Sequence, residues 1–169
     1  MKTIDSKAFS GMAYSPGKEI WIGPEDGDLP FYFDVSGDLT DSSEAMSLVA
    51  HFLDDFSNLE AKALSYLKTT LAHNESKDYE TVHYFLQYHV EEIEPEILQL
   101  MLRRNEENSI SIAELIDHLR VRRFGSHIDQ EMNQQVFIMD LSLNPEYSEE
   151  LMVIYFDTNK EIILITHES

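Results

Sequence analysis

Alternation of apolar and polar residues predicts β-structure near the start of the chain. Residues 31–35, FYFDV, switch faces at every position, so the odd-numbered side chains point to one side and the even-numbered ones to the other. Residues 18–22, KEIWI, are the expected partner strand, because the intervening GPEDGDLP is rich in turn-forming Gly and Pro. Residues 8–14, AFSGMAY, are a candidate for an opening strand.

The last part of the chain also predicts strands, the final two joined by the polar turn DTNK. In one of them Asp140 and Ser142 are expected to face outward. If the last strand lies at an edge, its polar ending HES discourages chance pairing. The four apolar runs are HLRVRRF, VFIMDLSL, LMVIYF and EIILIT. The inward-facing residues of the second run are Phe137, Met139, Leu141 and Leu143.

The middle of the chain shows the spacing of amphipathic helices. The first two helices are joined almost without a linker and should turn sharply at 56–58. A third helix begins near Asp78, and Pro95 either ends it or occupies the first turn of the next helix. The first helix carries an apolar stripe of Met46, Val49, Ala50 and Leu53. Three capping boxes are expected, at Asp41 with Glu44, Ser57 with Glu60, and Ser111 with Glu114.

This order of elements predicts an α+β fold in a single domain over 1–169. Strands are expected in 1–40 and 119–169, and helices in 41–118. Strands from both ends of the chain should form one mostly antiparallel sheet, with the central helical segment packed on one face.

Charge changes the picture more than any other bulk property. The 169 residues include 32 acids and 12 bases, which gives a net charge of −20, and the excess is spread along the chain. An acidic globular surface repels nucleic acid and anionic lipid, so neither is expected as a partner. The chain has no cysteine, no signal-like start and no apolar run of the roughly 18 residues that a membrane helix needs, so a cytoplasmic location is expected.

No catalytic, cofactor or metal site is expected. His51 and Asp55 have workable ligand spacing on a helix, but such pairs are common by chance in acidic helices. Neighbouring acids usually mark a solvated face, and no phosphate loop or nucleophile motif is present. The basic cluster of Arg120, Arg122 and Arg123 can grip an anion or pair with acids inside the chain, and the second reading is favoured.

A set of exposed acids and aromatics is predicted to bind a protein partner. Tyr84 and Tyr88 stand four residues apart, off the apolar stripe of their helix, and suit an interface, although core packing is slightly favoured for each aromatic taken alone. Trp21 and Tyr32 are aromatic candidates from the strands. The acidic candidates cluster on the predicted helix faces and are Asp54, Asp55, Glu91, Glu92, Glu94 and Glu96.

Several stretches together resemble an uncharacterised bacterial family of unknown function. They include FSGMAYSPGKEIWI, FDVSGDLTD, VHYFLQYHVEEI, HLRVRRFGSH and the closing LMVIYFDTNKEIILITHES. The resemblance implies similarity to the small acidic immunity proteins that are encoded beside polymorphic or contact-dependent growth-inhibition toxins. Such proteins bind one cognate toxin domain and block it, and the resemblance brings no catalytic residues.

The leading hypothesis is therefore an immunity protein that neutralises a basic toxin, with a nuclease as the favoured class, by occluding its cleft. One alternative is a small enzyme or ligand-binding domain with a pocket between sheet and helices; a deep pocket enclosing Arg or His with buried carboxylates would favour it. Another is an acidic subunit that mimics nucleic acid toward a DNA-binding protein of the host.

Overall fold

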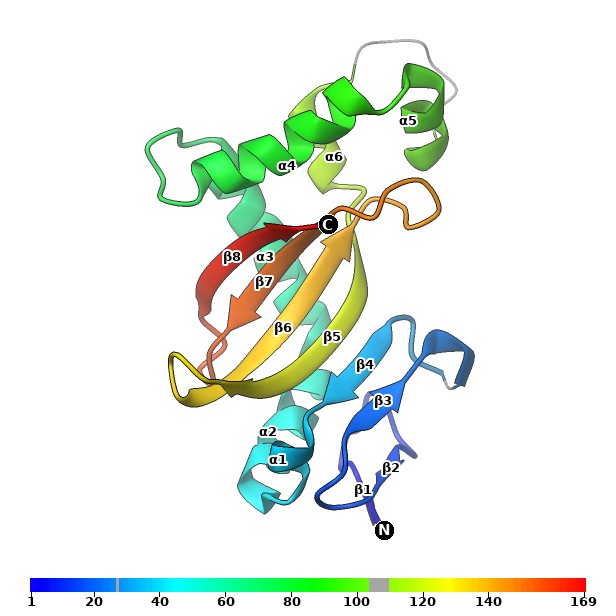
Figure 1. The fold of residues 1–169 in the computed structure, drawn as a ribbon, viewed down its shortest axis with the longest axis vertical. Coiled ribbons are helices and arrows are strands. Elements are labelled where there is room, and N and C mark those ends of the chain that lie inside the picture. Colours follow the sequence, from blue (N-terminus) through cyan, green and yellow to red (C-terminus); the bar gives the residue numbers. More distant parts are fainter. Residues whose placement is uncertain (27, 104–109) are drawn as a thin grey trace.

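A six-stranded sheet organises the chain, with strand order β3-β4-β5-β6-β7-β8 (Figure 1). The computed structural model describes residues 1–26, 28–103 and 110–169. Neighbouring strands are antiparallel except β4 and β5, which run parallel. The main strands are β3 (Ile20–Ile22), β4 (Tyr32–Val35), β5 (Arg120–Asp129), β6 (Gln134–Ser142), β7 (Leu151–Phe156) and β8 (Ile162–Glu168). The short β1 (Lys2–Thr3) and β2 (Ala13–Tyr14) form a separate pair.

The parallel pair explains why the α-helices of the described chain fall between β4 and β5. Two parallel neighbours need a long crossover connection, and the helical segment supplies it. The helices are α1 (Gly37–Thr40), α2 (Ser43–Asp54), α3 (Phe56–Leu71), α4 (Tyr79–Glu92), α5 (Pro95–Met101) and α6 (Ile112–Ile116), after a 3-10 turn at Pro24–Asp26. The predicted α+β fold with a mostly antiparallel sheet is confirmed.

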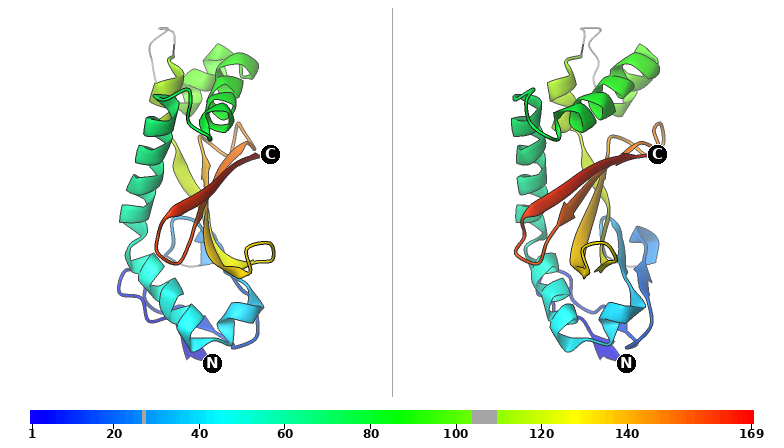
Figure 2. Two further views of the ribbon diagram at one scale, coloured as in Figure 1. Left: turned by 90° about the vertical axis from the view of Figure 1, so that its left-hand side faces the viewer. Right: turned by 60° about the vertical axis from the view of Figure 1, so that its left-hand side comes forward.

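The main core lies between the sheet and the helices. In Figure 2, α3 runs along one face of the sheet. The predicted stripe on α2 is buried in this core, and so are the inward residues of β6. Aromatic contacts tie the layers together: the rings of Phe52 and Phe137 stack 3.5 Å apart, and those of Phe31 and Phe56 stack 4.5 Å apart.

Two of the three predicted capping boxes are wrong. Ser42, not Asp41, caps α2, because its hydroxyl accepts from the Ala45 N–H at 3.1 Å. The turn between α2 and α3 occurs at the single residue Asp55, so α3 already includes 56–58. The box at the start of α6 is confirmed, with the Glu114 carboxylate accepting from the Ser111 N–H at 3.0 Å. These differences arise because cap positions depend on the chain geometry just before the helix.

The other local predictions are confirmed in part. Pro95 occupies the first turn of α5, and residues 157–160 form the hairpin turn between β7 and β8. The expected opening strand shrinks to β2, since residues 8–12 lie outside the strands, and residues 37–40 are helical although strands were expected up to 40. Asp140 and Ser142 do face away from the helices, but both are buried, which corrects their expected exposure.

The last strand, β8, lies at the edge of the sheet. Among the described residues, no helix combines the length and the hydropathy needed to cross a membrane.

Candidate functional site on the open sheet face

The face of the sheet opposite α2 and α3 carries the candidate site, and we call it the open face. Figure 2 shows that no helix of the described chain lies over this face. The strand register aligns its side chains in two rows across the sheet. One row is Trp21, Asp34, Gly125, Ile138, Tyr155 and Leu164. The other is Tyr32, Arg123, Asp140, Val153 and Thr166.

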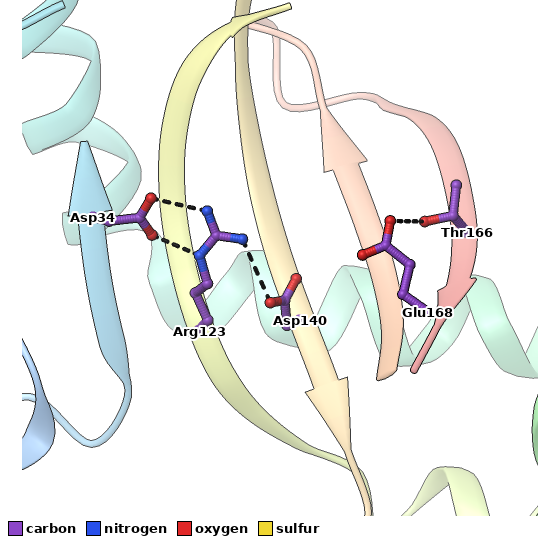
Figure 3. Close-up of polar contacts among 5 residues, drawn as sticks. All are labelled: Asp34, Arg123, Asp140, Thr166 and Glu168. Atoms are coloured by element: carbon purple, nitrogen blue, oxygen red, sulfur yellow. Dashed lines mark hydrogen bonds and ion pairs between the residues drawn. The ribbon is translucent and has the colours of Figure 1, made fainter. Parts of the chain in front are cut away.

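A guanidinium between two carboxylates forms the centre of the open face (Figure 3). Asp34 accepts two hydrogen bonds from Arg123, from Nε at 2.7 Å and from Nη2 at 2.9 Å. This fork-to-fork geometry is the strongest form of the pair. Asp140 lies on the other side, where its Oδ2 is 3.6 Å from Arg123 Nη1. The three residues come from β4, β5 and β6, so this cluster joins the N-terminal and C-terminal parts of the sheet.

Burial makes this cluster electrostatically unusual. The hydrogen bonds to Asp34 raise the pKa of Arg123 further above its usual range, against the opposing effect of burial. Burial raises the pKa of Asp140, and the nearby Arg123 only partly offsets that effect. The Asp140 side chain is only 8% exposed, and its Oδ1 has no hydrogen-bond partner. One carboxylate oxygen at the centre of the open face is therefore unsatisfied within the described part of the chain.

Gly125 makes the Asp34–Arg123 geometry possible. It is the register partner of Asp34 across the parallel strands, and the Asp34 carboxylate leans over it toward Arg123. A Cβ at this position would lie 2.5 Å from Asp34 Oδ1 and 2.8 Å from the Asp34 carbonyl oxygen. Only a residue without a side chain fits here.

Aromatic and apolar side chains surround the charged centre. Trp21 is 59% exposed, and its ring lies 6.0 Å from that of Tyr32. At the far end of the same row, Leu164 is 41% exposed. A small apolar cluster of Val136, Ile138 and Val153 fills the space between, beneath Leu151, Tyr155 and Ile163. A shallow pocket of about 320 Å³ opens here, lined by Trp21, Tyr32, Arg122, Arg123, Asp140 and Leu151.

Two of the predicted partner-binding acids already have partners inside the chain. Asp54 Oδ1 accepts from Ser6 Oγ and from the N–H groups of Lys7 and Ala8, at 2.8, 2.8 and 3.0 Å. These bonds, with the Ala8 amide first, lower the pKa of Asp54 and hold the N-terminal segment against α2. Asp55 has its pKa lowered by a bond from Asn58 and by Lys160 Nζ at 3.0 Å.

The remaining predicted residues gather at the opposite end of the molecule, on α4 and α5 (Figure 1). Tyr84 is 62% exposed and its ring contacts that of His167, while Tyr88 is half-buried. The acids of this group are exposed and are Glu91, Glu92, Glu94 and Glu96. The structure thus brings these six residues to one region but separates them from Asp54 and Asp55.

A buried histidine–serine pair had no signal in the sequence. His89 Nδ1 lies 2.8 Å from the Phe85 carbonyl oxygen, so this nitrogen carries the proton and donates. Its Nε2 then accepts from Ser148 Oγ at 2.9 Å. Ser148 Oγ also accepts from the Glu150 N–H. Because the pair is buried and its hydrogen bonds are satisfied, it fastens the β6–β7 loop to α4 rather than presenting a nucleophile.

The key residues of the open face were only partly predictable. The sequence favoured pairing of the arginine cluster with acids inside the chain, and this is confirmed for Arg123, whereas Arg120 donates to the carbonyl oxygens of Asp117 and Leu119. Asp34 and Asp140 were not assigned to a site, because their partner lies on strands whose register the sequence does not give. The pocket that contains arginines opens on the open face, not between sheet and helices. Within the described ranges, no group of three or more His, Asp or Glu side chains could hold a metal ion.

No protein-family model matches the chain, and searches of curated proteins and of solved structures give no match. The resemblance to immunity proteins therefore stays a hypothesis.

Proposed function

We propose that the protein is an immunity protein that binds a basic toxin, with a nuclease as the favoured class, and neutralises it. The observation that carries this proposal is the open face, where the exposed Trp21 and Leu164 flank the Asp34–Arg123–Asp140 cluster on a chain of charge −20. Interfaces draw most of their affinity from a few aromatic, arginine and apolar anchors surrounded by polar groups. This face offers both kinds of group.

The proposed mechanism is occlusion. A nuclease needs a positive cleft to hold phosphates, and an acidic protein can occupy that cleft in place of the nucleic acid. The negative field would raise the association rate, and this contribution falls as salt increases. Affinity would come from the anchors on the open face, and the exposed acids of α4 and α5 would add steering. The protein would act in the cytoplasm and transform no substrate itself.

The test is binding to the product of the adjacent upstream gene. The two proteins are co-expressed and purified together, and degradation of RNA and DNA by the neighbour is measured with and without this chain. We expect a complex and full protection. A neighbour that neither binds this chain nor degrades nucleic acid would refute the proposal.

Site-directed variants separate the open face from general acidity. Trp21→Ala removes an exposed anchor and should weaken the complex by about 2 kcal/mol or more, roughly 30-fold. Leu100→Ala is the matched control, because Leu100 is 58% exposed but lies on α5. Equal effects of the two variants would show that the open face is not the interface.

A further inference from the structure

The sheet has two edges, and they differ in how well they are protected. The β3 edge has only three residues, and Pro24 follows it closely. The β8 edge has seven residues, Ile162–Glu168, without proline or lysine. Natural edges are usually blunted by short length, proline, lysine or a covering element. The β8 edge lacks the first three of these protections, and it carries one bulge, at Ile163, which has no register partner on β7.

No other element of the described chain covers the β8 edge. In the sheet, β8 is the last strand and has no strand on its outer side among the described residues (Figure 1). The strand pairs with β7 on its inner side. Helix α4 approaches β8 from the helix-covered face, where the Phe85 and His167 rings lie 5.3 Å apart. Beyond the bulge, the outer backbone N–H and C=O groups of Leu164–Glu168 are therefore open to another strand.

The side chains of β8 also suit a strand partner. Ile162 and Ile163 are half-buried, Leu164 is exposed on the open face, and Ile165 is buried against the helices. An added strand would extend the open face and cover Leu164. Strand addition of this kind draws affinity from backbone hydrogen bonds and specificity from alternate side chains.

Charge indicates whether a second copy of this chain or a basic strand from another protein is better suited to pair with β8. In an antiparallel pair of two β8 strands centred on Ile165, Glu168 of each copy would lie within one residue of Glu161 of the other. Like charges placed close together across strands are destabilising, and each copy also carries −20. The cations near the start of the strand are already paired, Lys62 with Glu161 at 3.5 Å and Lys160 with Asp55 at 3.0 Å. Negative charge is left toward the end of the strand, at Glu168.

We propose that a basic, extended segment of a partner protein pairs with β8 as a seventh strand, with Lys or Arg facing Glu168. This inference rests on the proposed function for the nature of the partner. The edge and its charge come from the fold alone, so the two proposals can fail separately.

The direct test uses a peptide as long as β8, with alternating Thr and Val and a lysine at each end. Amide hydrogen exchange of residues 162–168 is followed by NMR as the peptide is added. At nine-tenths occupancy, the outward-facing amides of β8 should exchange about tenfold more slowly. Unchanged exchange at the highest soluble peptide concentration would overturn the proposal.

Two control peptides define the mode of binding. N-methylation of alternate residues on the pairing edge removes the backbone donors and should abolish the protection. Replacing both lysines with glutamate should weaken binding at least tenfold. If either control peptide protects β8 as well as the parent, the proposed pairing is wrong.

A variant then connects the edge to the natural partner. Leu164→Lys places a cation on the exposed edge and should weaken the binding of both the peptide and the partner at least tenfold. Leu100→Lys should leave peptide binding unchanged and weaken partner binding less than Leu164→Lys does, because α5 is proposed to contribute steering only. Circular dichroism verifies that both variants are folded. If Leu164→Lys binds the partner normally while Trp21→Ala does not, the strand proposal fails and the proposed function stands. If the peptide protects β8 but no toxin binds the chain, the strand proposal stands and the proposed function fails.

Discussion

Replacing Gly125 with alanine tests whether the centre of the open face is as tightly built as its geometry indicates. The new Cβ would lie 2.5 Å from Asp34 Oδ1 and 2.8 Å from the Asp34 carbonyl oxygen. The carboxylate can swing away only by giving up its bonds to Arg123 at 2.7 and 2.9 Å. The carbonyl oxygen can move only if β4 moves with it.

The magnitude follows from these two effects. Overpacking in a tight site costs about 1–3 kcal/mol. The hydrogen bonds to a charged group contribute about 1.5–3 kcal/mol each, and the lower end applies because the Arg123 side chain is 31% exposed. We expect Gly125→Ala to lower the free energy of unfolding by about 4–6 kcal/mol, a large share of the ~5–15 kcal/mol typical of a domain.

Urea unfolding followed by circular dichroism measures this loss. With a slope of about 2 kcal/mol per molar urea, the midpoint should fall by about 2–3 M. In an Asp34→Ala background the same substitution should cost at least about 1 kcal/mol less, because the clash with the carboxylate is gone. A change within about 0.5 kcal/mol for Gly125→Ala alone would refute the reasoning.

Three further substitutions test the remaining electrostatic arguments. Burial lowers the pKa of His89 in the folded state. The stability that depends on neutral His89 is therefore present above the unfolded pKa of about 6.5 and is lost as the pH falls through the lower folded value. Between pH 7 and pH 5, the urea midpoint of His89→Gln should drop less than that of the wild type. Asp54→Ala should speed amide exchange at Lys7 and Ala8, since both amides lose their acceptor. Burial raises the pKa of Asp140, so the charged carboxylate disfavours folding at a pH above that pKa. Asp140→Asn should therefore keep the free energy of unfolding at pH 7 within about 1 kcal/mol of the wild type, or increase it. A loss of about 3 kcal/mol would contradict this argument.

The centre of the open face combines a satisfied ion pair with a buried carboxylate. The Asp34–Arg123 pair is satisfied within the chain and holds β4 to β5, whereas Asp140 keeps one oxygen without a partner. Buried polar atoms without partners are rare in folded proteins. Because this oxygen is buried, the binding that we propose for the open face depends on exposed side chains such as Trp21.

The sequence by itself determined the type and order of the main elements. Alternation in 31–35 and in β6 predicted which side chains face the core, and the stripe on α2 predicted its buried face. These patterns can be read because the period of a strand or helix is set by local backbone geometry. The strands–helices–strands order then gave the α+β class.

The tertiary structure alone decided the site. Asp34 and Arg123 are 89 positions apart in the chain, and only the parallel register of β4 and β5 brings them together. The burial of Asp140 and the position of β8 at an edge likewise depend on which strands become neighbours. Periodicity carries no information about pairing between distant strands, because register is fixed by the packing of the whole sheet.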